Sequence, residues 1–294
     1  MNKKVKFSGL WTAILSVVSV AYIFPILLVL INSFKKKAYI SRYPFAIPTD
    51  KMFVGLENYV NGLEKTGFFQ AFGWTLFITV FSVAVILLCT SMCAWYINRV
   101  TNTLTKTMYM LCLFSMVVPF QMVMFTLSKI ANILKLNTPW GLIIIYLGYG
   151  AGLAVFMFSG FVKSIPIDIE EAAMIDGCGS FGTFLRVMIP NPLPLIPTVL
   201  VFSIVWYYND YYLSAIFFRA DFPLSVSLTN MSKLLGTYSQ GLQGMGGMTG
   251  QELGLMKEPV LACGCLLTLL PLILMYVLLQ RYFTEGVERS GIVG

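Results

Sequence analysis

Histidine is absent from the 294 residues of the chain, and charged residues make up only 11% of them. Without histidine the chain lacks the most common general base and a frequent zinc ligand. It also lacks the G-x-x-x-x-G-K-[ST] pattern with which P-loop ATPases bind phosphate. Clustered catalytic carboxylates are missing as well. The sequence therefore argues against an enzyme, a metal site or a P-loop nucleotide site on this chain.

Cysteine is sparse, and its placement predicts no disulfide. No two cysteines share an outer loop, where a disulfide would form. Cys89 and Cys93 share a helix face, but no histidine or carboxylate accompanies them as a metal ligand. We interpret the cysteines as small apolar side chains. They are Cys89, Cys93, Cys112, Cys178, Cys263 and Cys265.

Apolar residues make up 57% of the chain, and its mean hydropathy is +0.79. Runs of about 20 apolar residues cross a bilayer as helices, because each backbone polar group must be satisfied within its own segment. The sequence predicts an all-α, polytopic membrane protein with six transmembrane helices. These are expected at Leu10–Ile31, Phe69–Ile97, Met108–Ile130, Trp140–Val162, Leu195–Phe218 and Val260–Phe283.

Charge does not decide the orientation of these helices. The net charge of +7 is spread over loops and helix ends, which is typical of anchoring at a membrane surface and not of nucleic-acid binding. Lysines and arginines divide almost evenly between alternate loops. The first run is followed by INSFKKK instead of a cleavage site, so we expect a retained helix and not a signal peptide.

The segment EEAAMIDGCGSFGTFLRVMIP, from Glu170 to Pro190, is polar by comparison with its surroundings. Pro166 suits a first helical turn, and Gly177 suits a left-handed bend after Asp176. Ser180 is expected to cap a second short helix that Pro190 ends. The segment is therefore predicted to be two short helices joined at a glycine bend.

The second of these helices carries an apolar stripe at i, i+3, i+4 and i+7, which needs a partner. Four carboxylates against one arginine disfavour an anionic membrane surface. A groove on another protein is favoured, and packing against the chain's own helix ends stays open. The stripe consists of Phe181, Phe184, Leu185 and Met188.

From Glu171 the chain reads EAA-x3-G-x9-V-x-I-P, which resembles the EAA motif of ABC-importer permeases, EAA-x3-G-x9-I-x-L-P. Val187 and Ile189 are the two departures, and both are conservative. Other stretches resemble the carbohydrate-uptake, maltose-permease-like branch of that family. They are LENYV, VVPFQM, LKLNTPWGLII, YNDYYL and LLQRYFTEGVERSGIVG.

The resemblance implies a single permease domain over residues 1–294 in a bacterial or archaeal cell membrane, with core helices in about 69–283. It implies a cytoplasmic coupling loop at 163–194, cytoplasmic termini and a tail at 284–294 that either contacts the ATPases or ends freely. The implied partners are a second permease chain, two cytoplasmic ATPase subunits, an extracytoplasmic sugar-binding protein, membrane lipid and a sugar. ATP and magnesium would bind the ATPases, and no cofactor is expected on this chain.

The resemblance also assigns coupling residues. Phe184, Leu185 and Met188 are expected to form the surface docked on the ATPase, with Gly177 as the bend. Glu171 and Asp176 are expected to orient the loop by pairing with basic groups or by capping backbone; simple solvation stays open. The full set is Glu170, Glu171, Ala172, Ala173, Asp176, Gly177, Phe181, Phe184, Leu185, Met188 and Pro190.

An aromatic and polar cluster in the fifth run, with Gln121 near Pro119 in the third, is the candidate substrate pathway. Aromatic faces beside amide and carboxylate groups suit a sugar; anchoring at the membrane interface and bonding between helices remain alternatives. A non-sugar solute such as glycerol phosphate, or an ion-coupled carrier, is the alternative function. The candidates are Gln121, Trp206, Tyr207, Tyr208, Asn209, Asp210 and Tyr211.

Overall fold

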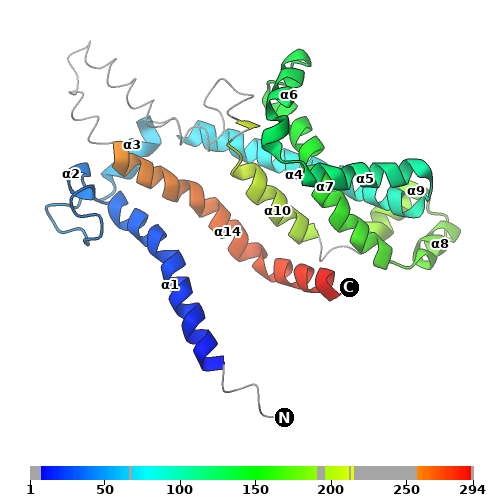
Figure 1. Cartoon of the computed structure of the whole chain (residues 1–294), viewed down its shortest axis with the longest axis horizontal. Helices are drawn as coiled ribbons and strands as arrows, with labels where there is room; N and C mark the ends of the chain where they lie inside the picture. Colours follow the sequence, from blue (N-terminus) through cyan, green and yellow to red (C-terminus); the bar gives the residue numbers. More distant parts are fainter. Residues whose placement is uncertain (1–7, 66–67, 191–195, 212, 215–256, 293–294) are drawn as a thin grey trace. The chain divides into compact units, whose positions relative to one another are not determined.

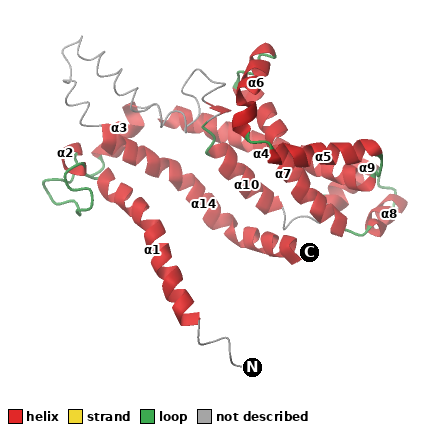
Figure 2. Cartoon of the chain, viewed as in Figure 1, coloured by secondary structure: helices red, strands yellow, loops and turns green. Residues whose placement is uncertain are grey.

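A computed structural model describes residues 8–65, 68–190, 196–211, 213–214 and 257–292. The described segments are helices joined by loops, with one isolated bridge between Lys35 and Phe53 (Figure 2). The chain divides into two compact units. One combines Met1–Phe69 with Ser227–Pro271, and the other combines Gln70–Val226 with Leu272–Gly294.

The first unit is held together by polar contacts around the end of its first helix. Asn58 donates hydrogen bonds to the carbonyl oxygens of Ser33 (2.8 Å) and Lys35 (3.1 Å). The Ser33 hydroxyl lies 2.8 Å from the Tyr59 hydroxyl, and the Cys263 thiol lies 3.6 Å from the Ser33 carbonyl oxygen. The helices here are α1 (Ser8–Ser33), α2 (Lys37–Ile40), α3 (Glu57–Lys65) and the start of α14 (Lys257–Ile292).

Lys35 is fully buried in this unit. Its ammonium donates to Asn32 Oδ1 at 2.9 Å and to the carbonyl oxygens of Tyr43 and Pro44 at 2.9 and 3.4 Å. Burial lowers the pKa of the Lys35 ammonium, because the charged form loses its hydration. These acceptors fix the loop between α2 and α3 against the end of α1.

The second unit contains the helices that position the candidate site. The capping box of Asn102 and Thr105 begins α5, and the Thr138 hydroxyl accepts from the Gly141 amide to begin α7. Figure 1 shows α4, α5 and α7 running alongside one another. The elements are α4 (Phe68–Arg99), α5 (Thr103–Val117), α6 (Phe120–Ile133), α7 (Pro139–Ser164), α8 (Ile167–Ile175), α9 (Ser180–Thr183), the π-helix Phe184–Met188 and α10 (Ile196–Tyr208).

The core of this unit lies where α7 meets its neighbours. Asn98 of α4 and Ser159 of α7 exchange hydrogen bonds of 2.8 and 3.1 Å. A Cβ atom on Gly152 would lie 2.6 Å from the Cys112 carbonyl oxygen, so only glycine permits this approach of α5 and α7. Small residues at such crossings are typical of helices packed in membranes.

Four of the six predicted spans are present as helices long and apolar enough to cross a membrane: α1, α4, α7 and α14. The third predicted run is not one straight helix, because α5 and α6 meet at an angle of 110°. Pro119 has no amide hydrogen and forces Val118 into extended backbone, which ends α5 there. With the bent pair counted as one span, the described residues contain five candidates, so six spans are not confirmed.

The fifth predicted run is represented by α10, which has 13 residues and is shorter than a full span. Residues 195, 212 and 215–218 of that run and the glycine-rich segment 241–254 lie outside the described residues. The backbone of α14 continues as helix to Ile292, through most of the expected tail at 284–294.

Candidate functional site

The segment between α7 and α10 bends at Gly177, as the sequence predicts. Gly177 has φ +86°, a left-handed conformation that side chains with a Cβ adopt at a cost. The amides of Gly177 and Cys178 donate to the carbonyl oxygens of Met174 and Ala173, at 3.1 and 3.0 Å, and close the end of α8. Open space surrounds the missing Cβ, so glycine is required here by backbone conformation and not by crowding.

The second half of the segment differs from the predicted regular helix. Gly179 and not Ser180 occupies the N-cap position of α9, and no side chain caps that helix. After one turn the backbone becomes a π-helix, in which the Ile189 amide donates to the Phe184 carbonyl oxygen at 2.9 Å. The π-helix ends at Met188, and Pro190 follows one residue later, after Ile189. Such turns lie outside what apolar periodicity predicts.

The predicted apolar stripe is divided between the interior and the surface. Phe184 and Met188 are 1% and 3% exposed and pack with Val162 and Ile165. They therefore cannot form the docked surface that the sequence predicts. Phe181 and Leu185 point outward, with 60% and 44% exposure.

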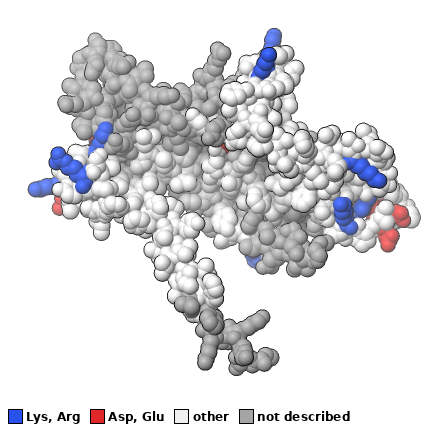
Figure 3. Space-filling model, in the orientation of Figure 1, with Lys and Arg blue, Asp and Glu red and all other residues white. Residues whose placement is uncertain are grey.

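The exposed half of the stripe continues onto the end of α8. Met174 and Ile175 are 49% and 85% exposed there. Together with Phe181 and Leu185 they form an apolar patch, which we call the outer patch. Acidic side chains gather at this end of the second unit (Figure 3).

The carboxylate that anchors the segment is Glu170, the residue before the motif glutamate. Glu170 is 3% exposed, whereas Glu171 and Asp176 are exposed, as is Ala172, with Ala173 half-buried. Glu170 Oε2 accepts from the Trp95 indole at 2.8 Å, and Oε1 accepts from Arg99 Nε at 2.7 Å. Among the described residues the basic partner, Arg99, belongs to Glu170 and not to Glu171, so the expected pairing of Glu171 stays a prediction.

Arg99 connects three helices through one guanidinium. Its Nη2 lies 2.6 Å from Glu170 Oε1 in an ion pair. The same nitrogen donates to the Ile165 and Val162 carbonyl oxygens, at 3.0 and 3.3 Å, at the end of α7. Breaking a buried pair by removing one partner typically costs about 3–5 kcal/mol. α8 is therefore fixed to the ends of both α4 and α7.

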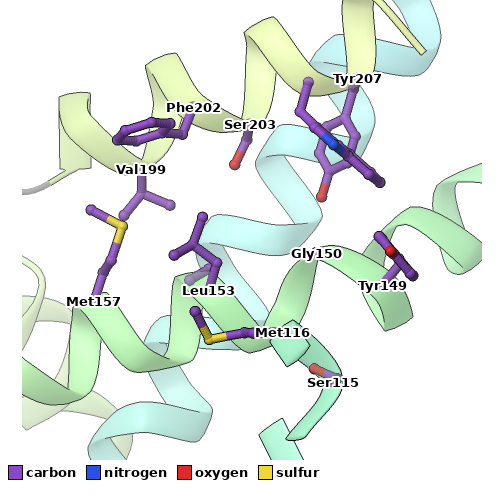
Figure 4. Close-up of a pocket in the computed structure, with 12 residues that line it drawn as sticks. Ser115, Met116, Tyr149, Gly150, Leu153, Met157, Val199, Phe202, Ser203 and Tyr207 are labelled. Carbon is purple, nitrogen blue, oxygen red and sulfur yellow. The ribbon is translucent and has the colours of Figure 1, made fainter. Parts of the chain in front are cut away.

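A cavity of about 270 Å³ lies between α5, α7 and α10 (Figure 4). Trp206 and Tyr207 of the predicted pathway line it, with Tyr149, Ser115 and Ser203. The rings of Tyr149 and Trp206 are stacked, with centroids 5.2 Å apart and planes 9° apart. Within the described residues, the side chains that line the cavity carry no charge.

The other predicted pathway residues do not line this cavity. Asp210 Oδ2 accepts from the Tyr146 hydroxyl at 2.8 Å and from the Ser214 amide at 3.0 Å, which indicates an internal structural role. Asn209 donates to the Val205 carbonyl oxygen at the end of α10. Of the rest, Tyr208 is buried, Tyr211 is exposed, and Gln121 is exposed in the first turn of α6.

The structure brings into these sites several residues that the sequence interpretation missed, among them Trp95, Arg99, Ser115 and Tyr149. Trp95 and Arg99 are four residues apart on α4, so their spacing predicts that they share a helix face. The spacing does not predict that both contact Glu170. Ser115 and Tyr149 contribute to the cavity from helices that the sequence alone did not place side by side.

Comparison with known proteins gives consistent matches along the chain. The family model described as "Binding-protein-dependent transport system inner membrane component" matches residues 86–289. The "Probable starch degradation products transport system permease protein AmyC" of Thermoanaerobacterium thermosulfurigenes is 31% identical over 276 residues, which cover 94% of this chain and 93% of AmyC. The "Melibiose/raffinose/stachyose import permease protein MelC" of Bacillus subtilis is 27% identical, covering 96% of each chain.

A solved structure shares the fold. It is the "Crystal structure of a bacterial ABC transporter involved in the import of the acidic polysaccharide alginate". One chain of it aligns with a TM-score of 0.73 and 19% identity, covering 96% of this chain and 99% of that chain. At that identity the match supports the fold alone.

Proposed function

This chain belongs to the family of binding-protein-dependent transport system inner membrane components, and on that premise we propose that it is the permease subunit of a sugar importer. It is a multi-pass membrane protein whose family leaves ATP hydrolysis to separate subunits. The finer proposal is that the chain forms half of a translocation pathway and is driven through the loop 163–194.

Oligosaccharide is the proposed substrate class. The relatives that match nearly the whole chain carry names that refer to starch degradation products and to melibiose, raffinose and stachyose. The cavity between α5, α7 and α10 supports this, because aromatic rings and hydroxyl groups suit the faces and rims of sugar rings. Its uncharged lining gives no support to a phosphate ester such as glycerol phosphate, which would need a lysine or arginine.

The outer patch is the proposed docking surface for the cytoplasmic ATPase. The observation that carries this proposal is the division of one short segment into two faces. One face, with Phe184, Met188 and Glu170, is fixed to the helix ends, while the other exposes Met174, Ile175, Phe181 and Leu185. An apolar face projecting from a rigid base suits insertion into a groove on a protein partner. Exposed Glu171 and Asp176 would then pair with basic groups of that partner.

The proposed assembly contains a second permease chain, two ATPases and an extracytoplasmic binding protein. If the loop 163–194 faces the cytosol and six spans are present, both termini are cytoplasmic. The segment 220–257, of which residues 220–256 lie outside the described part of the chain, would then face the binding protein. The last turns of α14, which remain helical to Ile292, would reach toward the ATPase side.

The function is tested with the complete importer, purified through a tag on this chain and reconstituted in liposomes with ATP inside. Uptake of radiolabelled maltotriose and raffinose is measured beside glycerol 3-phosphate, with and without the binding protein. The proposal expects binding-protein-dependent uptake of at least one sugar and none of glycerol 3-phosphate. Uptake of glycerol 3-phosphate alone, or sugar uptake without ATP, would contradict it.

A further inference from the structure

We propose that Arg99, Trp95 and Glu170 form a mechanical joint that transmits movement of the coupling loop to α4 and α7. This inference rests on the proposed coupling role of that loop and assigns positioning residues within it. The joint is made by Glu170, which is buried, whereas the motif residue Glu171 is exposed. Through this joint, a displacement of the outer patch would reach the membrane helices α4 and α7.

Hydrogen bonds from the ends of two long helices meet at this joint. Two residues of α4, Trp95 and Arg99, both donate to the single carboxylate of Glu170, one to each oxygen. Arg99 also donates to the Ile165 and Val162 carbonyl oxygens at the end of α7. A displacement of α8 is therefore applied to two long helices at once, through bonds whose directions are fixed by the planar guanidinium.

Trp95 contacts both halves of the loop. Its indole nitrogen binds Glu170 in α8, and its ring lies 5.6 Å from the ring of Phe184 in the π-helix. The bend at Gly177 separates these halves in sequence, so without a common support they could move independently. Trp95 supports both, and the loop moves as one body.

The contact between Arg99 and Glu170 is an ion pair with hydrogen bonds and not an apolar contact. A buried ion pair contributes little net stability compared with a well-packed apolar contact, but it fixes direction and register. An apolar contact lets one helix slide on another, whereas paired hydrogen bonds oppose sliding. The Glu170 side chain is 4% exposed and the Arg99 side chain 18%, which limits the access of water to these bonds.

The joint is tested in the reconstituted importer by measuring sugar molecules transported per ATP hydrolysed. The variants are Glu170→Gln, Arg99→Lys and the double variant Arg99→Met with Glu170→Met. Asp168→Asn is the matched control, because Asp168 is a carboxylate on the same helix and is exposed. The probe is radiolabelled maltotriose or raffinose, whichever the wild-type importer takes up.

We expect Glu170→Gln and Arg99→Lys to lower the transport-to-hydrolysis ratio by at least about fivefold. ATPase co-purification should be retained, and Asp168→Asn should match wild type. The double variant should assemble with the ATPase, because two apolar side chains replace the pair, yet stay uncoupled. This separates a coupling role from a role in folding alone.

Two results would overturn the joint. One is a wild-type ratio in Glu170→Gln or Arg99→Lys; the other is recovery of the wild-type ratio by the double variant, which would mean that any packed contact suffices. Either result leaves the proposed function intact, provided that wild-type transport still depends on ATP and the ATPase co-purifies. Failure of the wild-type importer to bind an ATPase would instead remove the coupling role itself.

Discussion

The indole ring of Trp95 lies against the phenyl ring of Phe184, with centroids 5.6 Å apart and planes inclined by 34°. This contact joins the end of α4 to the π-helix and places Phe184 in the interior of the second unit. The side chain that the sequence assigns to a docking surface is thus a structural support. In our proposal the docking surface consists instead of exposed residues of the loop, among them Phe181 and Leu185.

Replacing Phe184 by alanine should destabilise the loop. Deleting a buried phenyl ring costs about 3–5 kcal/mol, because a cavity remains where the ring packs. Thermal unfolding of the purified permease should occur at a lower temperature than in wild type. Phe181→Ala is the matched control, since Phe181 is 60% exposed; it should unfold like wild type but recover less ATPase on co-purification. Equal unfolding temperatures for the two variants would contradict the division of the stripe.

Gly177 should tolerate substitution poorly for a backbone reason. Alanine at φ +86° costs about 1–2 kcal/mol, and proline cannot adopt a positive φ or donate the amide hydrogen that Met174 O accepts. Gly177→Pro should therefore abolish sugar uptake, while the chain still inserts in the membrane. Uptake by cells and the amount of chain in the membrane fraction measure the two effects. Normal sugar uptake by Gly177→Pro would show that transport does not need the bend at Gly177.

Glu171 should contribute to binding of the ATPase and not to the stability of this chain. Because its side chain is exposed, Glu171→Lys should leave the unfolding temperature of the isolated permease unchanged while lowering uptake and ATPase recovery. The comparison is Glu170→Lys, which places a second cation beside Arg99 and should lower the unfolding temperature as well. The interpretation fails if Glu171→Lys transports normally.

Asp210 is expected to be structural. Its carboxylate accepts from the Tyr146 hydroxyl, so Asp210→Ala and Tyr146→Phe should each reduce stability by about 1–3 kcal/mol, with non-additive effects in the double variant. The Michaelis constant for the transported sugar should not change in either. A raised Michaelis constant for Asp210→Ala, with Tyr146→Phe unaffected, would place Asp210 in the pathway instead.

Because of Lys35, the stability of the first unit should depend on pH. Its folded pKa lies below its ordinary value of 10.5, so the unfolded chain binds the proton more readily. Stability should therefore rise as pH increases from the lowered pKa toward the ordinary one. Lys35→Met should remove this slope and take the ammonium donor away from three oxygen acceptors, while Lys36→Met, at an exposed position, should retain the slope. Chemical unfolding at several alkaline pH values measures both.

Hydropathy predicts the helices of this chain well because satisfying the backbone in lipid leaves few alternatives. The sequence also predicts the bend at Gly177, because a left-handed residue after a helix favours glycine. The sequence does not predict the contact between Arg99 and Glu170, because the two residues are 71 positions apart and only the fold brings them together. The break at Pro119 was present in the sequence, but apolar composition continued across it and favoured one long helix.

The π-helix after Thr183 explains the main error in the candidate site. A regular helix would place Phe181, Phe184, Leu185 and Met188 on one face, whereas the structure buries Phe184 and Met188 together and leaves the other two outside. Apolar spacing cannot distinguish a stripe that docks on a partner from one that packs on the chain's own helices. Burial supplies that distinction.

The central claim is that the loop 163–194 is held by a nucleotide-hydrolysing subunit in the cytosol. Its most direct test is a cysteine at Phe181 in a background without the native cysteines, treated in intact membranes with a short bifunctional thiol cross-linker. The account predicts a covalent product with the ATPase that Ile144→Cys, exposed on α7 away from the loop, does not give. Labelling of the Phe181 cysteine by an impermeant reagent from outside the cell, without any product with the ATPase, would contradict it.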